Sequence, residues 1–180
     1  MSEEVHELAE HAEHAAHDSS LAPVTVTMAV LAVLVAAVSL LGHRAHTEEI
    51  LFQNKATDTW NEYQAKSIRR HGYEQFTDLL SISDFKKVEA AAKMKEKYSR
   101  EIDRYKDDQD KLQAEARSLE DEVGAEGRKA NRFDLGEVCL EAALVITSMT
   151  IITRRRIFWY GGSVLALAGL GLAVTGFLVH

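Results

Sequence analysis

Three carboxylates recur at helical spacing inside an otherwise apolar stretch of the chain. Asp134, Glu137 and Glu141 are three and four residues apart in FDLGEVCLEAALVITSMT, so a helix presents them on one face. Glu141 lies nearly two turns into the apolar segment, where an ionised carboxylate costs up to about 2.5–3.5 kcal/mol at the centre of a bilayer. We therefore expect this carboxylate to face protein or water and to have a partner.

Basic and titratable partners are available where the preceding apolar stretch ends. They are His43, Arg44 and His46, which are predicted to leave the first span on the membrane side where the carboxylates enter the second. Three interpretations remain open. The carboxylates pair structurally with Arg44, Arg132 or the histidines, they line a cation pathway in an oligomer, or they reach to the membrane surface.

A second group of possible ligands lies in the acidic, histidine-rich amino-terminal segment, residues 1–21. His11, His14 and His17 could present imidazoles to a divalent ion. Their three-residue spacing spreads them partly around a helix, so a solvated helix with weak Glu–His pairs, or a disordered tail, is favoured over a metal site. No Walker loop, G-x-S-x-G, HExxH or paired-cysteine motif occurs. We expect no cofactor, no resident metal and no enzymatic activity.

Three apolar stretches set the architecture. Pro23–Leu41, Leu135–Thr153 and Ile157–Val179 each have about the ~20 residues that a helix needs to cross a bilayer, and the first and third carry no charge. The sequence predicts an all-α membrane protein with three transmembrane helices and a long antiparallel, coiled-coil-like helical hairpin between the first and second. The predicted boundaries are 22–43, 133–153 and 157–179 for the transmembrane helices and 44–132 for the hairpin segment.

The hairpin segment divides at Ser81–Asp84 into helices over 44–80 and 84–123. Gly124 and Gly127 are expected to end the second helix, since glycine is a common helix terminator. Apolar positions recur in both limbs with charges on the flanks, as in coiled coils. The predicted hairpin contacts are aromatic: Phe52, Trp60, Tyr63 and Phe76.

Small residues recur at three- and four-residue spacing in the first and third spans. Such stripes allow helix backbones to approach closely in lipid. The predicted packing residues are Ala29, Ala32 and Ala36 in the first span and Gly162, Ala166, Gly169, Ala173 and Gly176 in the third. The pattern leaves open whether each stripe packs within the chain or on a neighbouring copy.

Charge distribution bears on topology and partners. Arg154, Arg155 and Arg156 form a short basic loop between the second and third spans, which favours a cytoplasmic loop and amino terminus and a periplasmic hairpin. Basic residues near the membrane ends of the hairpin segment and the acidic amino-terminal segment favour the reverse. Net charge is −7 and no extended basic patch is present, so no nucleic-acid partner is expected. The lone cysteine, Cys139, cannot form an internal disulfide.

The segment NKATDTWNEYQAKSI, residues 54–68, resembles a bacterial membrane-protein family known as domain of unknown function 4337. The order of acidic head, first span, helical insert and paired terminal spans is also similar. The resemblance implies a multi-pass protein of the bacterial inner membrane and supplies no activity or catalytic residue.

We expect a non-enzymatic integral membrane protein that self-associates into a helical assembly with a scaffold or membrane-organising role. Two alternatives stay open. The chain is a cation channel or transport component with second-span carboxylates near a pore, or it is an accessory subunit of a larger membrane complex.

Overall fold

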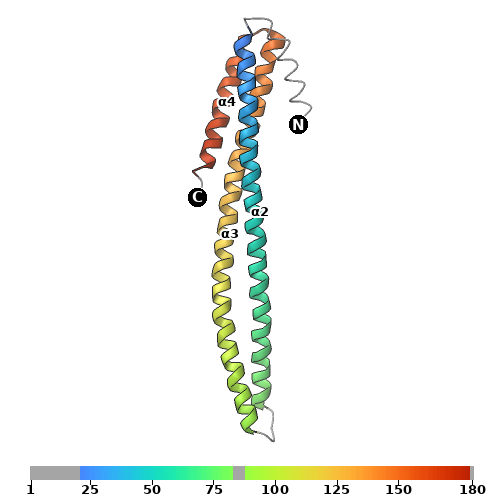
Figure 1. The fold of residues 1–180 in the computed structure, drawn as a ribbon, viewed down its shortest axis with the longest axis vertical. Coiled ribbons are helices and arrows are strands. Elements are labelled where there is room, and N and C mark those ends of the chain that lie inside the picture. The colour runs from blue at the N-terminus through green and yellow to red at the C-terminus, as the bar shows by residue number, and fades with distance from the viewer. Residues whose placement is uncertain (1–20, 83–87, 179–180) are drawn as a thin grey trace. The chain divides into compact units, whose positions relative to one another are not determined.

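A computed structural model describes residues 21–82 and 88–178, and its regular elements in that range are all α-helices (Figure 1). Helix α2 runs over Ala22–Ile82, α3 over Val88–Thr153 and α4 over Arg156–Gly176. Each contains a stretch long and apolar enough to cross a membrane. The predicted all-helical class and the three apolar helices are therefore confirmed. The predicted amino-terminal helix lies outside the described residues.

Helices α2 and α3 are longer than the predicted elements. Each continues from an apolar stretch into the hairpin segment without interruption, and α2 joins the predicted segments 22–43 and 44–80 in one helix. The expectation that Gly124 and Gly127 end a helix is wrong, because α3 continues through both. An interior glycine costs a helix only about 1 kcal/mol relative to alanine, and it keeps the backbone N–H that proline lacks. α4 begins at Arg156 and ends at Gly176, three residues before the predicted limit.

The chain divides into two compact units. The three-helix unit comprises residues 1–48 and 125–180, and the hairpin unit comprises residues 49–124.

The core of the three-helix unit forms where its helices meet. On α2 the buried apolar positions follow helical spacing, as the spacing of Val24, Met28 and Leu31 illustrates. The remaining members of this core are Val38, Ala45, Ala130, Phe133, Leu140, Ala143, Leu144 and Ala173. Several of them are small, which keeps the helix axes close.

A very short turn connects α3 to α4. Only Arg154 and Arg155 lie between the two helices, and Arg154 adopts a left-handed conformation with φ 51°. The amide of Phe158 donates a hydrogen bond to the carbonyl of Arg155 at 3.3 Å as α4 begins. This turn makes α3 and α4 antiparallel neighbours.

The hairpin unit is held by aromatic rings and by an apolar seam between α2 and α3. Tyr73 lies between Tyr98 and Tyr105, with ring centroids 5.2 and 5.9 Å away. The seam residues with the least exposure are Ala56, Tyr105, Gln109, Leu112 and Ala116. Contacts that join early α2 residues to late α3 residues, and the reverse, show that the two limbs are antiparallel within this unit (Figure 1).

Candidate functional site: a polar cluster at the end of the apolar helices

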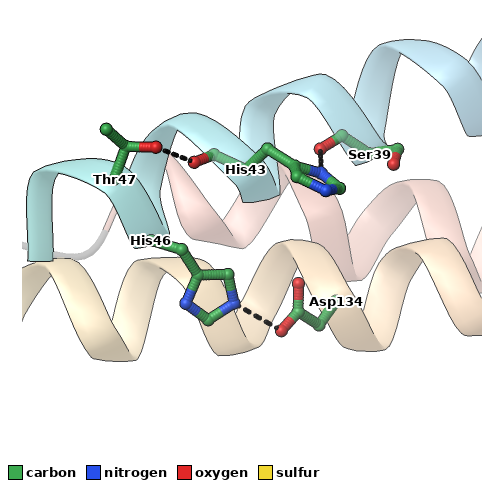
Figure 2. Close-up of polar contacts among 5 residues, drawn as sticks. All are labelled: Ser39, His43, His46, Thr47 and Asp134. Carbon is green, nitrogen blue, oxygen red and sulfur yellow. Dashed lines mark hydrogen bonds and ion pairs between the residues drawn. The ribbon is translucent and has the colours of Figure 1, made fainter. Parts of the chain in front are cut away.

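The polar cluster forms where the apolar part of α2 ends and that of α3 begins. Nε2 of His46 lies 3.0 Å from Oδ2 of Asp134, and both side chains are about half exposed, at 50% and 46% (Figure 2). In the tautomer protonated at Nε2, His46 donates this hydrogen bond. One turn away, Nδ1 of His43 lies 2.8 Å from the carbonyl oxygen of Ser39. His46 therefore joins α2 to α3, whereas His43 bonds its own helix.

Gly42 makes this approach possible. A Cβ atom at Gly42 would lie 3.0 Å from Oδ1 of Asp134 and 3.6 Å from Cβ of Phe133. A larger side chain would push Asp134 away from the helix surface. Gly42 is thus a buried contact point within a continuous helix.

The arginines do not take part in this pairing. Arg44 and Arg132 are exposed, and neither forms an ion pair with Asp134 or Glu137 within the described segments. Of the pairings considered from the sequence, the one with a histidine is present.

The deeper carboxylates lie away from the core of the three-helix unit. Glu137 is half-buried and Glu141 is exposed. Glu141 shares its side of α3 with Val138 and Val145, which are 61% and 57% exposed. Within residues 21–82 and 88–178 neither carboxylate has a hydrogen bond or ion pair. The expectation that Glu141 faces protein or water and has a partner therefore stays a prediction, because no partner lies among the described residues of one chain.

The small-residue stripe of α4 packs on α3 of the same chain. A Cβ at Gly169 would lie 2.9 Å from the carbonyl oxygen of Gly136, and a Cβ at Gly136 would lie 2.9 Å from that of Gly169. The two backbones therefore pack against each other with no room for a side chain between them. Gly176 packs against the ring of Phe133, since a Cβ added at Gly176 would lie 3.0 Å from Cε1 of Phe133. Ala173 is buried and Ala166 is half-buried beside them.

Two threonines of α3 are enclosed in this contact. Thr147 and Thr150 are each 0% exposed, and their hydroxyl oxygens have no hydrogen-bond partner among the described residues. The position of a Cβ at Gly162 would collide with Oγ1 of Thr147. The side of α3 that packs on the α4 stripe was not predicted from the sequence. The signal was present, since small residues recur there at spacings of three and four: Gly136, Cys139, Ala143, Thr147 and Thr150.

The stripe predicted for the first span is not the packing face of α2 within the chain. Ala29 and Ala36 are exposed and Ala32 is half-buried. The side that packs carries Val24, Met28 and other larger residues. These larger side chains belong to the core that α2 shares with the other two helices, so small residues are not required on this side.

The aromatic residues predicted for the hairpin make different kinds of contact. Trp60 donates from Nε1 to Oε1 of Glu120 at 2.8 Å and meets the edge of Tyr63 at 5.4 Å. Phe52 has the ammonium of Lys55 over its ring at 5.4 Å. Phe76 remains 57% exposed, with its ring centroid 6.1 Å from that of Tyr98. Tyr73, at the centre of the aromatic group, was not singled out from the sequence.

An ion pair crosses the hairpin beside these rings. Nζ of Lys66 lies 3.0 Å from Oδ2 of Asp108 and 3.2 Å from Oε1 of Glu62. The hydrogen bond from Lys66 lowers the pKa of Asp108, and the hydrogen bonds to Asp108 and then Glu62 raise the pKa of Lys66. Both shifts favour the charged forms.

Metal binding finds no support in the described segments. No group of three or more His, Cys, Asp or Glu side chains within them could hold an ion. Cys139 is a free, half-buried thiol in α3. His11, His14 and His17 lie outside the described residues.

Neither a curated protein nor a solved structure is matched by the chain. The model of a family described as "Domain of unknown function (DUF4337)" matches residues 20–179. That range covers the three helices and confirms the resemblance carried by residues 54–68. The chain belongs to the DUF4337 family.

Proposed function

We propose that this protein is a non-enzymatic, multi-pass protein of the bacterial inner membrane that self-associates and organises the membrane. Helices α2, α3 and α4 each contribute one transmembrane segment, and the hairpin unit is a coiled-coil-like stalk outside the lipid. The arginines of the α3–α4 turn favour a cytoplasmic turn and amino terminus and a periplasmic hairpin.

The observation that carries self-association is an exposed apolar stripe on α2 in the hairpin unit. Ile68, Phe76 and Leu79 are 73%, 57% and 53% exposed. They share one side of the helix with Gly72. A Cβ atom added at Gly72 would have no neighbouring atom within 4 Å, so this side of the helix is open. No lipid covers a stalk, so in water this stripe favours contact with another helix. A second copy supplies a helix with the same spacing.

Glu141 supports association at the level of the membrane as well. It is exposed on the three-helix unit among apolar side chains. A single copy would turn this carboxylate toward lipid at a cost of up to about 2.5–3.5 kcal/mol. Contact with a neighbouring copy removes Glu141 from lipid and offers it polar partners.

The copy number in mild detergent tests the proposal. Native mass spectrometry of the full chain is expected to give more than one copy per particle. Replacing the stripe residues, I68Q with L79Q, is expected to lower the copy number. The matched variant A114Q with E115Q changes exposed α3 residues and is expected to leave it unchanged. A monomer at all protein concentrations excludes self-association.

Cysteine labelling tests the topology. In a chain with Cys139→Ala, a new cysteine at exposed Ser118 is expected to react from the periplasmic side with a maleimide that cannot cross membranes. Labelling only after the membrane is opened would place the hairpin in the cytoplasm.

The outward position of Glu141 next to half-buried Glu137 also favours a second function, cation conduction between copies. Liposomes with the wild-type chain would then pass cations, and E137Q with E141Q would reduce the flux. Tight liposomes with verified, oriented protein would rule conduction out.

A further inference from the structure

A cluster of three cationic side chains lies at the turn between α3 and α4. Arg154, Arg155 and Arg156, here called the arginine turn, are all exposed. None of them forms an ion pair with another residue in 21–82 or 88–178. Their guanidinium groups are therefore available to an anion from outside these segments.

Carboxylates are remote from the arginine turn in the described part of the three-helix unit. Helix α4 contains no acidic residue, and α2 contains none from Ala22 to Thr47. Along α3 the preceding carboxylate is Glu141, thirteen positions before Arg154, or roughly 20 Å at ~1.5 Å per residue. The positive charge at this end of the unit is not balanced by these helices.

Two aromatic rings adjoin the turn at the start of α4. Nε1 of Trp159 donates to Oγ1 of Thr27 at 3.1 Å, which ties the start of α4 to α2. Tyr160 is 59% exposed, and its ring centroid lies 5.2 Å from that of Trp159. Tryptophan and tyrosine at the end of an apolar helix are typical of the lipid headgroup region. The hydrogen bond to Thr27 holds one of them in place.

We propose that the arginine turn binds the phosphate groups of anionic phospholipids. This inference rests on the membrane insertion proposed above. The two residues between the helices are too few to carry the guanidinium groups away from the headgroups. Arginine donates two parallel hydrogen bonds to a phosphate, and clustered basic residues beside a span attract anionic lipid. The site therefore prefers phosphatidylglycerol to a zwitterionic lipid.

Fluorescence quenching of Trp159 measures this preference directly. The chain has two tryptophans, so W60F leaves Trp159 as the sole reporter. The W60F chain is placed in phosphatidylcholine nanodiscs with phosphatidylglycerol or phosphatidylcholine brominated close to the headgroup. We expect brominated phosphatidylglycerol to quench at about one-fifth of the concentration or less, since each arginine near the surface contributes about a fivefold preference. High salt should reduce the difference.

Charge-matched variants identify the residues responsible. R154Q with R155Q and R156Q is expected to abolish the preference, whereas R128Q with K129Q and R132Q removes the same charge elsewhere in the unit and should preserve it. R154K with R155K and R156K should retain a preference, because charge is kept. Circular dichroism melts confirm that each variant is folded.

Three results would overturn the proposal. They are equal quenching by the two lipids, a preference that survives the triple glutamine change, and a preference that appears only after deletion of residues 2–18. The last would mean that the acidic amino-terminal segment occupies the arginine turn. Chemical cross-linking on the same nanodiscs reports copy number separately. A monomer that retains the lipid preference would contradict only the proposed self-association. An oligomer that lacks the preference would contradict only the proposed lipid binding.

Discussion

The two units achieve helix packing by opposite means. In the three-helix unit, glycines let α3 and α4 approach closely, and Gly136 and Gly169 bring the two backbones together. In the hairpin unit, α2 and α3 are separated by large rings, with Tyr73 between Tyr98 and Tyr105. The difference is the one expected if, as proposed, the three-helix unit lies in lipid and the hairpin unit in water. Removing an aromatic ring from water into a protein core is strongly favourable. In lipid there is no such gain, and close van der Waals contact is the main attraction between helices.

Both units also bury polar groups that have no hydrogen-bond partner among residues 21–82 and 88–178. Thr147 and Thr150 do so in the three-helix unit, and Gln109, 2% exposed, does so in the hairpin unit. The register set by Lys66–Asp108 and Tyr73–Tyr105 places Gln109 opposite the part of α2 that contains Arg70. Nε of Arg70 has no hydrogen bond among the described residues but lies 3.5 Å from Oε1 of Glu74, with which it forms an ion pair. The hairpin thus has a polar layer within an aromatic seam. Such layers cost stability and favour one register.

The largest effect is expected from removing a ring in the hairpin. Tyr105 is 7% exposed and stacks on Tyr73, so Tyr105→Ala should destabilise the hairpin by about 3–5 kcal/mol, as for other buried aromatic truncations. Phe76→Ala, at a ring that is 57% exposed, should cost much less. Hydrogen exchange measured by mass spectrometry on the full chain resolves the two units. Equal protection in the two variants would mean that the stacked rings do not hold the hairpin.

Adding a side chain at the α3–α4 contact should have the next largest effect. A Cβ at Gly169 would lie 2.8 Å from Cβ of Cys139 and 2.9 Å from the carbonyl of Gly136. Gly169→Leu should therefore destabilise the three-helix unit by about 1–3 kcal/mol or more. Gly171→Leu, two residues away with nothing within 4 Å of its Cβ position, is the control. Thermal melts in detergent should separate the two variants, and similar melts would remove this face from the packing scheme.

Replacing the polar layer should stabilise the hairpin. Gln109→Leu removes an amide whose nitrogen and oxygen have no partner among the described residues, and the gain should be about 1–2 kcal/mol. Gln64→Leu, at an exposed position, should change stability by less than about 0.5 kcal/mol. Hydrogen exchange in the hairpin reports both. A loss of protection in Gln109→Leu would show that the amide is bound in the assembled protein.

The smallest effect is expected from the ion pair. The pKa of Asp108 is lowered from 3.8, so its contribution is present above that value and is lost as pH falls through the folded pKa. The pKa of Lys66 is raised from 10.5, so its contribution is present below that value and is lost as pH rises through the folded pKa. Between these limits, D108N should lower the hairpin melting temperature slightly. The difference from wild type should vanish in acid, and a difference that persists there would assign the effect to packing.

Periodicity predicted the arrangement of the helices better than it predicted their contacts. The apolar stretches, the hairpin and the small face of α4 could be read from the sequence, because each depends on residue type along one helix. The packing side of α2 could not be, since Ala29 and Ala36 reveal only that they are small, not what lies opposite them. The continuity of α3 through Gly124 and Gly127 was also missed. Glycine is a common helix terminator, but its cost within a helix, about 1 kcal/mol relative to alanine, is small enough for the rest of a long helix to offset.

The site was predicted in part for similar reasons. Spacing placed Asp134, Glu137 and Glu141 on one side of a helix, and the chain order placed His46 near Asp134, where the structure has their hydrogen bond. The outward position of Glu141 depends on where α2 and α4 lie around α3. A single helix pattern contains no such information.

The brevity of the link between α3 and α4 has a consequence for biosynthesis. With only Arg154 and Arg155 between the helices, the 21 residues of α4 follow α3 out of the ribosome within about 1–4 s at 5–20 residues per second. The apolar part of α3 and α4 would then reach the translocon almost together. If the chain inserts as proposed, Glu141 would enter the bilayer together with α4, whose only charged residue is Arg156 at its start.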